Sequence, residues 1–352
     1  MREKIILQGI IMHKKGLVIG KFLPPHKGHE YLFKFAEQYC EQLYIIVDCI
    51  EGQSIMPSVR KGWIEKIMPH ANVIALPNNM PQDPSDNPEF WPIWKNALYE
   101  AIGGKPDILI AAMDYGWELS QVLECEFTPC DIARESVPIS ATEIRANPLD
   151  NWKYIIDSAK PYFMKKVCLI GPESTGKTTC AIKLAQELDT VFVPEYAKSV
   201  IEKQNGQFFY NNVEQVATAQ VCSENALKHM VNKIMICDSD VITTMIWSDI
   251  LFGKHPKILD TIAQSQKYDL TLLFSPDVAW VDDQHRQCLP NAADSNIRWD
   301  FFYKMEEKLK QLDRHYVIIN GSYENRFEQS LQTIHSEVFN RYKNINNNGL
   351  KL

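Results

Sequence analysis

The sequence predicts an α/β protein of two doubly wound parallel-sheet domains, over residues 1–160 and 161–352. Short apolar runs alternate with helical patterns along both halves, which is typical of parallel sheets covered by helices. The 352 residues are enough for two domains, each with its own core. Between the halves, the stretch NPLDNWKYIIDSAKPYF (147–163) carries one helical pattern and then a proline, which indicates the boundary.

The first half contains four apolar runs that predict strands: GLVIG (16–20), LYIIVD (43–48), NVIAL (72–76) and DILIAA (107–112). After the first run, apolar residues recur at helical spacing and predict the buried face of a helix: Tyr31, Leu32, Phe35, Ala36 and Tyr39. The stretch 76–92 is rich in Pro, Asn and Asp and predicts a long loop. Loops of that length in a compact domain tend to be functional.

The second half contains five apolar runs that predict strands: KVCLIG (166–171), VFVPE (191–195), KIMICD (233–238), LTLLFS (270–275) and YVIING (316–321). A helical pattern, TTCAIKLAQEL, follows the first of them. The alternation therefore predicts a second parallel sheet.

Composition excludes several classes of protein. Charged residues make up 23% and hydrophobic residues 45%, as in ordinary globular proteins, and the net charge of -7 argues against broad binding of nucleic acid or anionic membranes. No run reaches 18 apolar residues, and the start lacks the pattern of a secretory signal. The nine cysteines form no CxxC pair, so we expect reduced cysteines and a cytoplasmic protein.

The segment GPESTGKT (171–178) matches the phosphate-loop pattern G-x-x-x-x-G-K-[ST], through Gly171, Gly176, Lys177 and Thr178. It lies between a predicted strand and a predicted helix, as this loop requires. Backbone N–H groups and the helix N-terminus would face the phosphates of ATP, with the lysine on the β- and γ-phosphates and the threonine on Mg²⁺. We also expect ATP contacts from Glu173, Ser174, Thr175 and Thr179.

Further polar residues follow the other strands of this half and favour a kinase. Asp238 and Asp240 end the run ICDSD, where a carboxylate can hold Mg²⁺ or accept a hydroxyl proton. The alternative for Asp240 is a helix cap. Glu195 and Tyr196 follow another strand at the edge where ligands bind such sheets. Arg286 is a candidate lid residue that neutralises the transferred phosphate, or else a solvated surface arginine.

The first half carries a second candidate site in GKFLPPHKGHEYL, which follows the first strand and opens the first helix. His26 and His29 can donate hydrogen bonds to phosphate oxygens and stabilise a crowded phosphorus. Metal binding is the competing interpretation, although no cysteine or carboxylate lies at ligand spacing.

The segment ISATEIR (139–145) supplies groups that a phosphate site needs. Ser140 and Thr142 are candidate N-cap hydroxyls, and Arg145 follows on the same helical face. Arg134 is a further candidate. Alone, the segment is a capped helix; together with the histidine loop it indicates a second nucleotide-phosphate site.

These segments resemble the motif pair of the nucleotidylyltransferase superfamily, G-x-F-x-P-x-H-x-G-H and I-S-x-T-x-I-R. With a phosphate-loop half that contains PEYAKS, CDSDVITT and DVAWVDDQHR, residues 16 to about 335 resemble the bifunctional nicotinamide-nucleotide adenylyltransferase/ribosylnicotinamide kinases. The resemblance implies a Rossmann-like nucleotidylyltransferase domain followed by a P-loop kinase domain.

The resemblance also implies a salvage enzyme for NAD. The second half would phosphorylate nicotinamide riboside with ATP and Mg²⁺, using Lys177, Thr178 and an aspartate, Asp238 or Asp240. The first half would transfer the adenylyl group of ATP to nicotinamide mononucleotide (NMN), giving NAD and pyrophosphate. Its ATP contacts would be Gly20, Lys21, Phe22, His26, Gly28, His29, Ser140, Thr142 and Arg145.

Two positions depart from the family pattern. AAMDYG has Asp114 in place of a longer acid, and PEYAKS has Lys198 where arginine is common, so bidentate recognition is not expected there. Some relatives carry an N-terminal helix-turn-helix domain. About 15 residues precede the first predicted strand here, so we expect no such domain and no DNA binding.

Several aromatic residues are candidates for stacking on nicotinamide: Trp91, Trp94, Tyr196 and Trp247. Ordinary core packing is the alternative for each tryptophan. Arg60 is either a substrate-phosphate contact or a surface arginine.

Two other functions remain as alternatives. One is a different adenylyltransferase–kinase fusion, such as one that makes coenzyme A; the other is a nucleotide-sensing regulator with decayed sites. The partners expected are ATP, nicotinamide riboside, NMN and NAD, with no nucleic acid and no membrane, and the sequence is compatible with a homo-oligomer.

Overall fold

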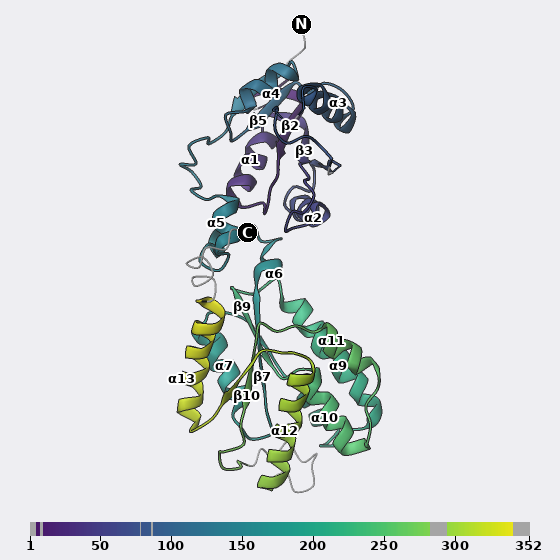
Figure 1. Cartoon of the computed structure of the whole chain (residues 1–352), viewed down its shortest axis with the longest axis vertical. Helices are drawn as coiled ribbons and strands as arrows, with labels where there is room; N and C mark the ends of the chain where they lie inside the picture. The colour runs from purple at the N-terminus through teal and green to yellow at the C-terminus, as the bar shows by residue number, and fades with distance from the viewer. Residues whose placement is uncertain (1–4, 8–9, 78, 86, 282–293, 341–352) are drawn as a thin grey trace. The chain divides into compact units, whose positions relative to one another are not determined.

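The computed structural model describes residues 5–7, 10–77, 79–85, 87–281 and 294–340. The chain divides into two compact units, residues 1–160 and 161–352 (Figure 1). The eight cysteines in the described part form no disulfide, and six of them are buried. None of the helices described there is both long enough and apolar enough to cross a membrane.

The first unit contains five parallel strands in the order β4-β3-β2-β5-β6, and β1 pairs antiparallel with β2. The strands are β1 (Ile5–Leu7), β2 (Ile10–Gly20), β3 (Cys40–Val47), β4 (Asn72–Ala75), β5 (Ile108–Ala111) and β6 (Glu126–Pro129). The chain winds outward from β2 to β4 and then returns to β5 on the other side of β2. In such sheets, ligands bind at the carboxyl ends of the strands where the winding reverses.

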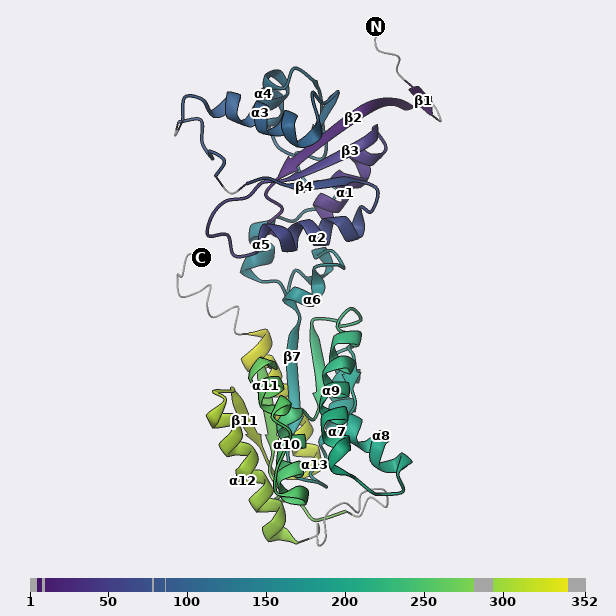
Figure 2. The same ribbon diagram turned by 90° about the vertical axis from the view of Figure 1, so that its right-hand side faces the viewer.

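Helices cover both faces of this sheet (Figure 2). They are α1 (Lys27–Glu37), α2 (Pro57–Ile67), α3 (Phe90–Ile102), α4 (Gly116–Val122) and α5 (Ala141–Ala146). A 3₁₀ turn follows at Trp152–Tyr154, and the short α6 (Lys160–Phe163) falls where the chain divides into its two units. In Figure 2, α1 and α2 lie on one side of the sheet and α3 and α4 on the other. The unit is therefore doubly wound.

The core of the first unit follows from the alternation of side chains along the strands. Val18 packs with the residues of α1 and α2, whereas Leu17 and Ile19 pack with those of α3 and α4. The buried face of α1 differs from the predicted one, because Tyr31 is exposed and Phe33 is fully buried. Leu32 and Ala36 are buried as predicted.

The second unit contains five parallel strands in the order β11-β10-β7-β9-β8. They are β7 (Lys165–Ile170), β8 (Phe192–Val193), β9 (Ile234–Asp238), β10 (Leu270–Phe274) and β11 (Tyr316–Ile319). The central strand is β7, so the loop that follows it lies at the point where the winding reverses.

The helices of the second unit also form two layers. They are α7 (Lys177–Glu187), α8 (Tyr196–Lys203), α9 (Tyr210–Leu227), α10 (Val241–Phe252), α11 (Ile258–Ser265), α12 (Ser295–Gln311) and α13 (Tyr323–Ile334), followed by a π-helical turn at His335–Phe339. Val167 and Leu169 pack with α7 and α13. Cys168 and Ile170 pack with α10 and α12 on the opposite face.

The predicted fold class, two doubly wound parallel-sheet domains, is confirmed. The prediction missed β6, because the sequence EFTP is short and half polar and gives no apolar run. It made β8 too long, since only Phe192 and Val193 pair with β9.

Candidate functional sites

The first site lies in the loop between β2 and α1. Phe22 takes a positive φ of 46° and is buried against His29 and Phe33. A Cβ on Gly20 would lie 2.9 Å from the Phe22 ring, so this position accommodates only glycine without movement of the ring. Gly20 and Phe22 thus shape the loop, and His26 follows as the residue that precedes α1.

The two histidines lie against each other in this loop. Their ring centroids are 3.7 Å apart, and the backbone N–H of His26 donates a 3.3 Å hydrogen bond to Nδ1 of His29. The acceptor Nδ1 carries no proton, so the proton of a neutral His29 ring is on Nε2. Among the described residues, Nδ1 of His26 is buried without a hydrogen-bond partner. The pair therefore presents ring nitrogen atoms whose hydrogen-bonding capacity is not filled by the described residues.

Both imidazoles are neutral at pH 7. Burial lowers the pKa of His26 to about 4, with a further contribution from the charge of Arg134. Burial also lowers the pKa of His29 well below its ordinary value, and His26 and Arg134 add to the effect. Neutral imidazoles donate hydrogen bonds without the cost of a buried charge. Among the described residues there is also no cluster of three His, Cys, Asp or Glu side chains suited to a metal ion.

The segment ISATEIR lies beside this loop. Ser140 caps α5 and exchanges hydrogen bonds with Glu143: its Oγ accepts from the Glu143 N–H at 3.2 Å, and its N–H donates to the carboxylate at 2.8 Å. Arg145 donates to the carbonyl of Leu23 and, at 3.1 Å, to Oγ1 of Thr142. The structure therefore brings the two segments into contact through the Arg145 guanidinium.

The structure corrects both interpretations of Arg60. Its side chain is completely buried, and it donates to the carbonyls of Ile55 and Asp48 at 3.1 Å, to the carbonyl of Lys21 and to the amide of Gln53. Arg60 is therefore neither on the surface nor available to a phosphate. It braces the backbone on which the exposed Lys21 lies.

The other candidates of the first unit lie on α3 and just before α4. Trp94 is buried, and its indole donates to the carbonyl of Pro81 at 2.9 Å, which ties the long loop to α3. Trp91 is half-buried and packs on Phe90. Asp114 is exposed, whereas its neighbour Tyr115 reaches the end of β2 and donates to the carbonyl of Ile19 at 3.1 Å. Apart from its place in AAMDYG, no sequence signal pointed to Tyr115.

The second site is the phosphate loop between β7 and α7. Its backbone has positive φ at Gly171 (153°), Ser174 (56°) and Gly176 (84°). A Cβ on Gly171 would lie 2.6 Å from the carbonyl oxygen of Phe274, so glycine is required there. Lys177 begins α7, and its ammonium donates to the carbonyl of Pro172 at 2.8 Å, which folds the side chain back over the loop.

Thr178 and Asp238 meet at the start of α7. The Thr178 hydroxyl donates to Oδ2 of Asp238 at 2.6 Å. Asp238 ends β9, which pairs with β7, the strand that leads into the phosphate loop and α7. A hydroxyl and a carboxylate beside a phosphate loop are oxygen ligands of the kind that Mg²⁺ takes, so this pair fits the predicted metal.

The structure corrects the assignment of Asp240 to catalysis and favours the alternative, a helix cap. Asp240 is buried, accepts the N–H of Thr243 at 3.3 Å and forms an ion pair with Arg314. Arg314 also donates to the carbonyl of Ala263 at 2.8 Å. The Asp240 carboxylate is thus held in a buried structural contact.

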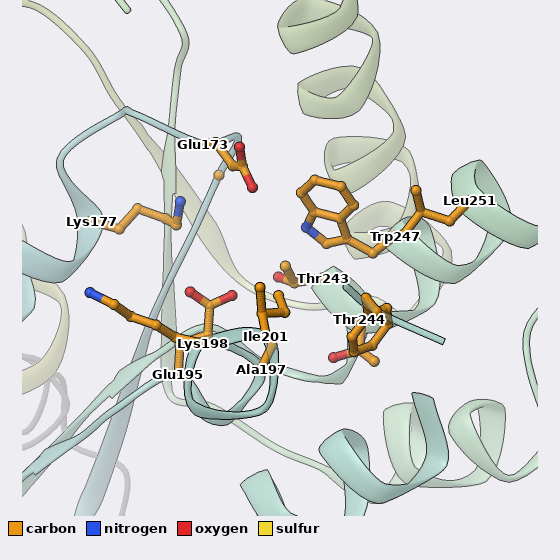
Figure 3. A pocket seen from close by; sticks show the side chains of 12 residues that line it. Glu173, Lys177, Glu195, Ala197, Lys198, Ile201, Thr243, Thr244, Trp247 and Leu251 are labelled. Atoms are coloured by element: carbon orange, nitrogen blue, oxygen red, sulfur yellow. The ribbon is translucent and has the colours of Figure 1, made fainter. Parts of the chain in front are cut away.

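A cavity opens on one side of the phosphate loop (Figure 3). Five predicted residues line it: Gly171, Glu173, Lys177, Glu195 and Trp247. The charged side chains gather at one end, and Trp247 lies with Leu251 at the other. The lining residues that the sequence did not single out are Ala197, Ile201, Phe208, Thr243, Thr244 and Leu251, together with Lys198, noted there only as a departure. The cavity thus has an apolar, aromatic wall at one end and charged side chains beside the phosphate loop at the other.

Tyr196 is not among the described residues that line this cavity. Tyr196 is half-buried at the start of α8, and its N–H binds the side chain of Gln220 at 3.0 Å. Arg286 lies outside the described residues.

A second cavity lies along α7 and the start of α13. It is lined by residues 173–180 and by Lys183, Lys198, Trp280, Val281, Tyr323, Glu324, Arg326 and Phe327. Only Glu173, Lys177 and Lys198 line both cavities. The phosphate loop thus separates two spaces that share one cluster of charged side chains.

Comparisons with known proteins agree with this arrangement. A family model described as an AAA domain matches residues 166–326. The trifunctional NAD biosynthesis/regulator protein NadR of Escherichia coli (strain K12) is 25% identical over 340 residues, which cover 91% of this chain and 82% of that protein. NadR of Salmonella typhimurium (strain LT2) is also 25% identical, over 342 residues with the same coverage.

Solved structures show the same fold. A crystal structure of a NadR protein in complex with NR has a TM-score of 0.76 at 20% identity and covers 93% of this chain and 97% of that chain. The NadR protein in complex with NAD and AMP-PNP gives the same values.

The comparisons confirm the predicted class of protein, a nucleotide-binding transferase. They also confirm the resemblance drawn from the motifs: over nine-tenths of its length, the chain is similar to the trifunctional NAD biosynthesis/regulator proteins.

Proposed function

We propose that the chain is a bifunctional enzyme of NAD salvage, which converts nicotinamide riboside to NMN in residues 161–352 and NMN to NAD in residues 1–160. The observation that carries the proposal is the pair of phosphate-type loops, one in each unit, both at the carboxyl end of a central strand. The similarity to NadR proteins, one of them solved with NR and another with NAD and AMP-PNP, supports the choice of substrates.

In the kinase half, ATP occupies the cavity along α7, and the riboside occupies the cavity with Trp247. The indole packs on the nicotinamide ring, so the 5′-hydroxyl faces the charged end of the cavity. Glu195 accepts the hydroxyl proton, and Lys177 leaves the Pro172 carbonyl to bind the β- and γ-phosphates. Thr178 and Asp238 hold Mg²⁺, which supplies positive charge against the phosphate oxygens.

In the adenylyltransferase half, the NMN phosphate attacks the α-phosphorus of ATP and pyrophosphate leaves. No side-chain nucleophile is needed, because the residues orient the reactants and stabilise the charge that develops on phosphorus. His26 and His29 donate to the phosphate oxygens as neutral imidazoles. Ser140, Thr142 and Arg145 bind the remaining oxygens from α5.

The test is incubation of the pure protein with ATP, Mg²⁺ and nicotinamide riboside, with separation of the products by chromatography. We expect NMN to appear first and NAD to follow. Phosphopantetheine serves as a second acceptor, and we expect no product from it. Formation of neither NMN nor NAD would refute the proposal, and turnover of phosphopantetheine instead would identify a coenzyme A enzyme.

A further inference from the structure

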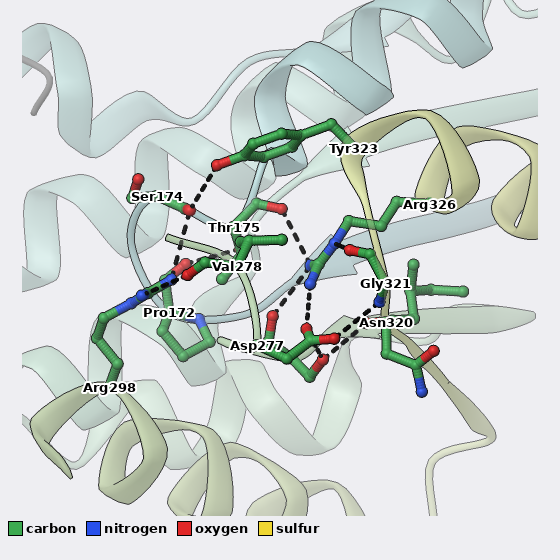
Figure 4. Close-up of polar contacts among 12 residues, drawn as sticks. Pro172, Ser174, Thr175, Asp277, Val278, Arg298, Asn320, Gly321, Tyr323 and Arg326 are labelled. Carbon is green, nitrogen blue, oxygen red and sulfur yellow. Dashed lines mark hydrogen bonds and ion pairs between the residues drawn. The ribbon is translucent and has the colours of Figure 1, made fainter. Parts of the chain in front are cut away.

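Side chains from α12 and α13 donate hydrogen bonds to backbone carbonyls of the phosphate loop. The Tyr323 hydroxyl donates to the carbonyl of Ser174 at 3.3 Å, and Nη1 of Arg326 donates to the carbonyl of Thr175 at 3.2 Å (Figure 4). Arg298 adds a longer contact of 3.4 Å to the same Ser174 carbonyl. These residues lie more than a hundred positions further along the chain than the loop they contact.

Contacts to these carbonyls have a consequence for the opposite side of the loop. In a trans peptide, the carbonyl oxygen and the following N–H point in opposite directions across one rigid plane. A donor that fixes the Ser174 carbonyl therefore fixes the direction of the Thr175 N–H. In the same way, Arg326 fixes the direction of the Gly176 N–H through the carbonyl of Thr175. Such N–H groups are the ones with which this type of loop binds phosphate.

Arg326 is itself rigidly placed. Only 1% of its surface is exposed, and it donates to the carbonyls of Gly321 at 2.7 Å and Ser275 at 3.0 Å. It also forms an ion pair with Asp277. One guanidinium thus joins the loops that follow β7, β10 and β11, three neighbouring strands of the sheet.

Asp277 and Tyr323 complete the arrangement. The Asp277 carboxylate accepts the N–H of Gly321 at 2.8 Å and the hydroxyl of Ser275. Partial burial alone raises the pKa of Asp277, but these two donors and Arg326 outweigh it and hold the pKa below its usual range. The Tyr323 ring lies so close to the phosphate loop that a Cβ on Gly176 would be 2.8 Å away.

We propose that Arg326, assisted by Tyr323, is a positioning residue of the kinase half, which sets the phosphate loop in its binding geometry through the carbonyls of Thr175 and Ser174. The inference rests on the proposed function in that it takes the loop to bind the triphosphate of ATP. It goes beyond that function in assigning the direction of the loop's N–H groups to contacts that α13 makes with the loop's carbonyls.

The test measures binding of AMP-PNP with Mg²⁺ by calorimetry. The full-length chain carries His29→Ala, so that the binding measured is that of the kinase half. We expect Arg326→Lys to weaken AMP-PNP binding by about 10- to 100-fold. Lysine keeps the positive charge but lacks the planar guanidinium that donates to several carbonyls at once. The KM for nicotinamide riboside, whose cavity lies on the other side of the loop, should stay unchanged.

Arg314→Lys is the matched control. The Arg314 side chain is also shielded from solvent, forms an ion pair with an aspartate and donates hydrogen bonds to backbone carbonyls. None of its described contacts reaches the phosphate loop. The substitution should lower the unfolding temperature in a similar way and leave AMP-PNP binding unchanged. Equal weakening by both substitutions, or unchanged binding in Arg326→Lys, would overturn the inference.

A second variant keeps the test decisive if Arg326→Lys does not fold. Tyr323→Phe removes one hydroxyl from a half-exposed residue, and we expect AMP-PNP to bind about 3-fold more weakly. Unchanged binding in this folded variant would contradict the inference. Failure of the unsubstituted chain to phosphorylate the riboside would refute the proposed function alone, since AMP-PNP binding still reports on the loop.

Discussion

The loop after β2 and the loop after β7 occupy equivalent places in two different sheets, and they prepare for phosphate in different ways. The first relies on side chains: two buried, neutral histidines and an arginine that reaches in from α5. The second relies on backbone: positive φ values, glycines and one lysine that opens the helix. In the proposed function, the first loop therefore binds phosphate through side-chain donors, the two histidines and Arg145, and the second through oriented backbone amides and Lys177.

The largest expected effect comes from removing the lysine of the phosphate loop, which should inactivate one half of the chain and leave the other active. Lys177→Ala should lower riboside phosphorylation by about a thousandfold or more, because it removes the positive charge that the phosphate loop would place on the β- and γ-phosphates. NAD synthesis from supplied NMN should be unchanged. Loss of both activities, measured by product chromatography, would contradict independent sites.

The neutral donors give the next effect. His29→Ala should slow NAD synthesis from NMN by about a hundredfold, since it removes a positioned donor from the developing charge. His29→Asn, which keeps an N–H donor, should recover part of the rate. Riboside phosphorylation is the internal control and should not change. An unaltered rate of adenylyl transfer would remove His29 from the site.

Lys198 tests whether the two cavities of the kinase half act together. Lys198→Met should lower kcat for riboside phosphorylation by about 10-fold, because Lys198 lines both cavities and its ammonium would stabilise the phosphate that passes between them. Lys198→Arg should retain the rate. Lys183 lines only the cavity along α7, so Lys183→Met should affect the KM for ATP and not kcat; the same kcat loss there would argue against a special role for Lys198.

The smallest expected effect is the contribution of His26 to the pH dependence of the free energy of unfolding. The pKa of His26 is about 4 in the folded protein against 6.5 in the unfolded chain, so the unfolded chain binds more protons between these values. Stability therefore falls as the pH falls below 6.5, by up to about 3 kcal/mol for this group below pH 4. His26→Gln should flatten the pH dependence of urea unfolding in the first unit; an unchanged slope would show that His26 is not buried as a neutral ring.

The sequence predicted these loops well because their requirements are local. Glycine at positive φ, a lysine at a helix start and histidines before a helix are visible as spacing. The roles of Arg60, Asp240 and Arg326 were not visible, because each depends on partners far away: Arg60 on three carbonyls, Asp240 on Arg314, and Arg326 on Thr175 and Asp277. Nor does a pattern reveal which side chains line a cavity, as Thr243 and Thr244 show.

The central claim, two independent sites that act in sequence, is tested most directly by mixing variants. Lys177→Ala and His29→Ala proteins are assayed separately and together for NAD formation from ATP, Mg²⁺ and nicotinamide riboside. We predict that neither variant alone forms NAD at an appreciable rate, and that the mixture does, because NMN released by the His29→Ala protein is adenylylated by the Lys177→Ala protein. A mixture that forms no NAD, although each variant retains its other activity, would contradict the account.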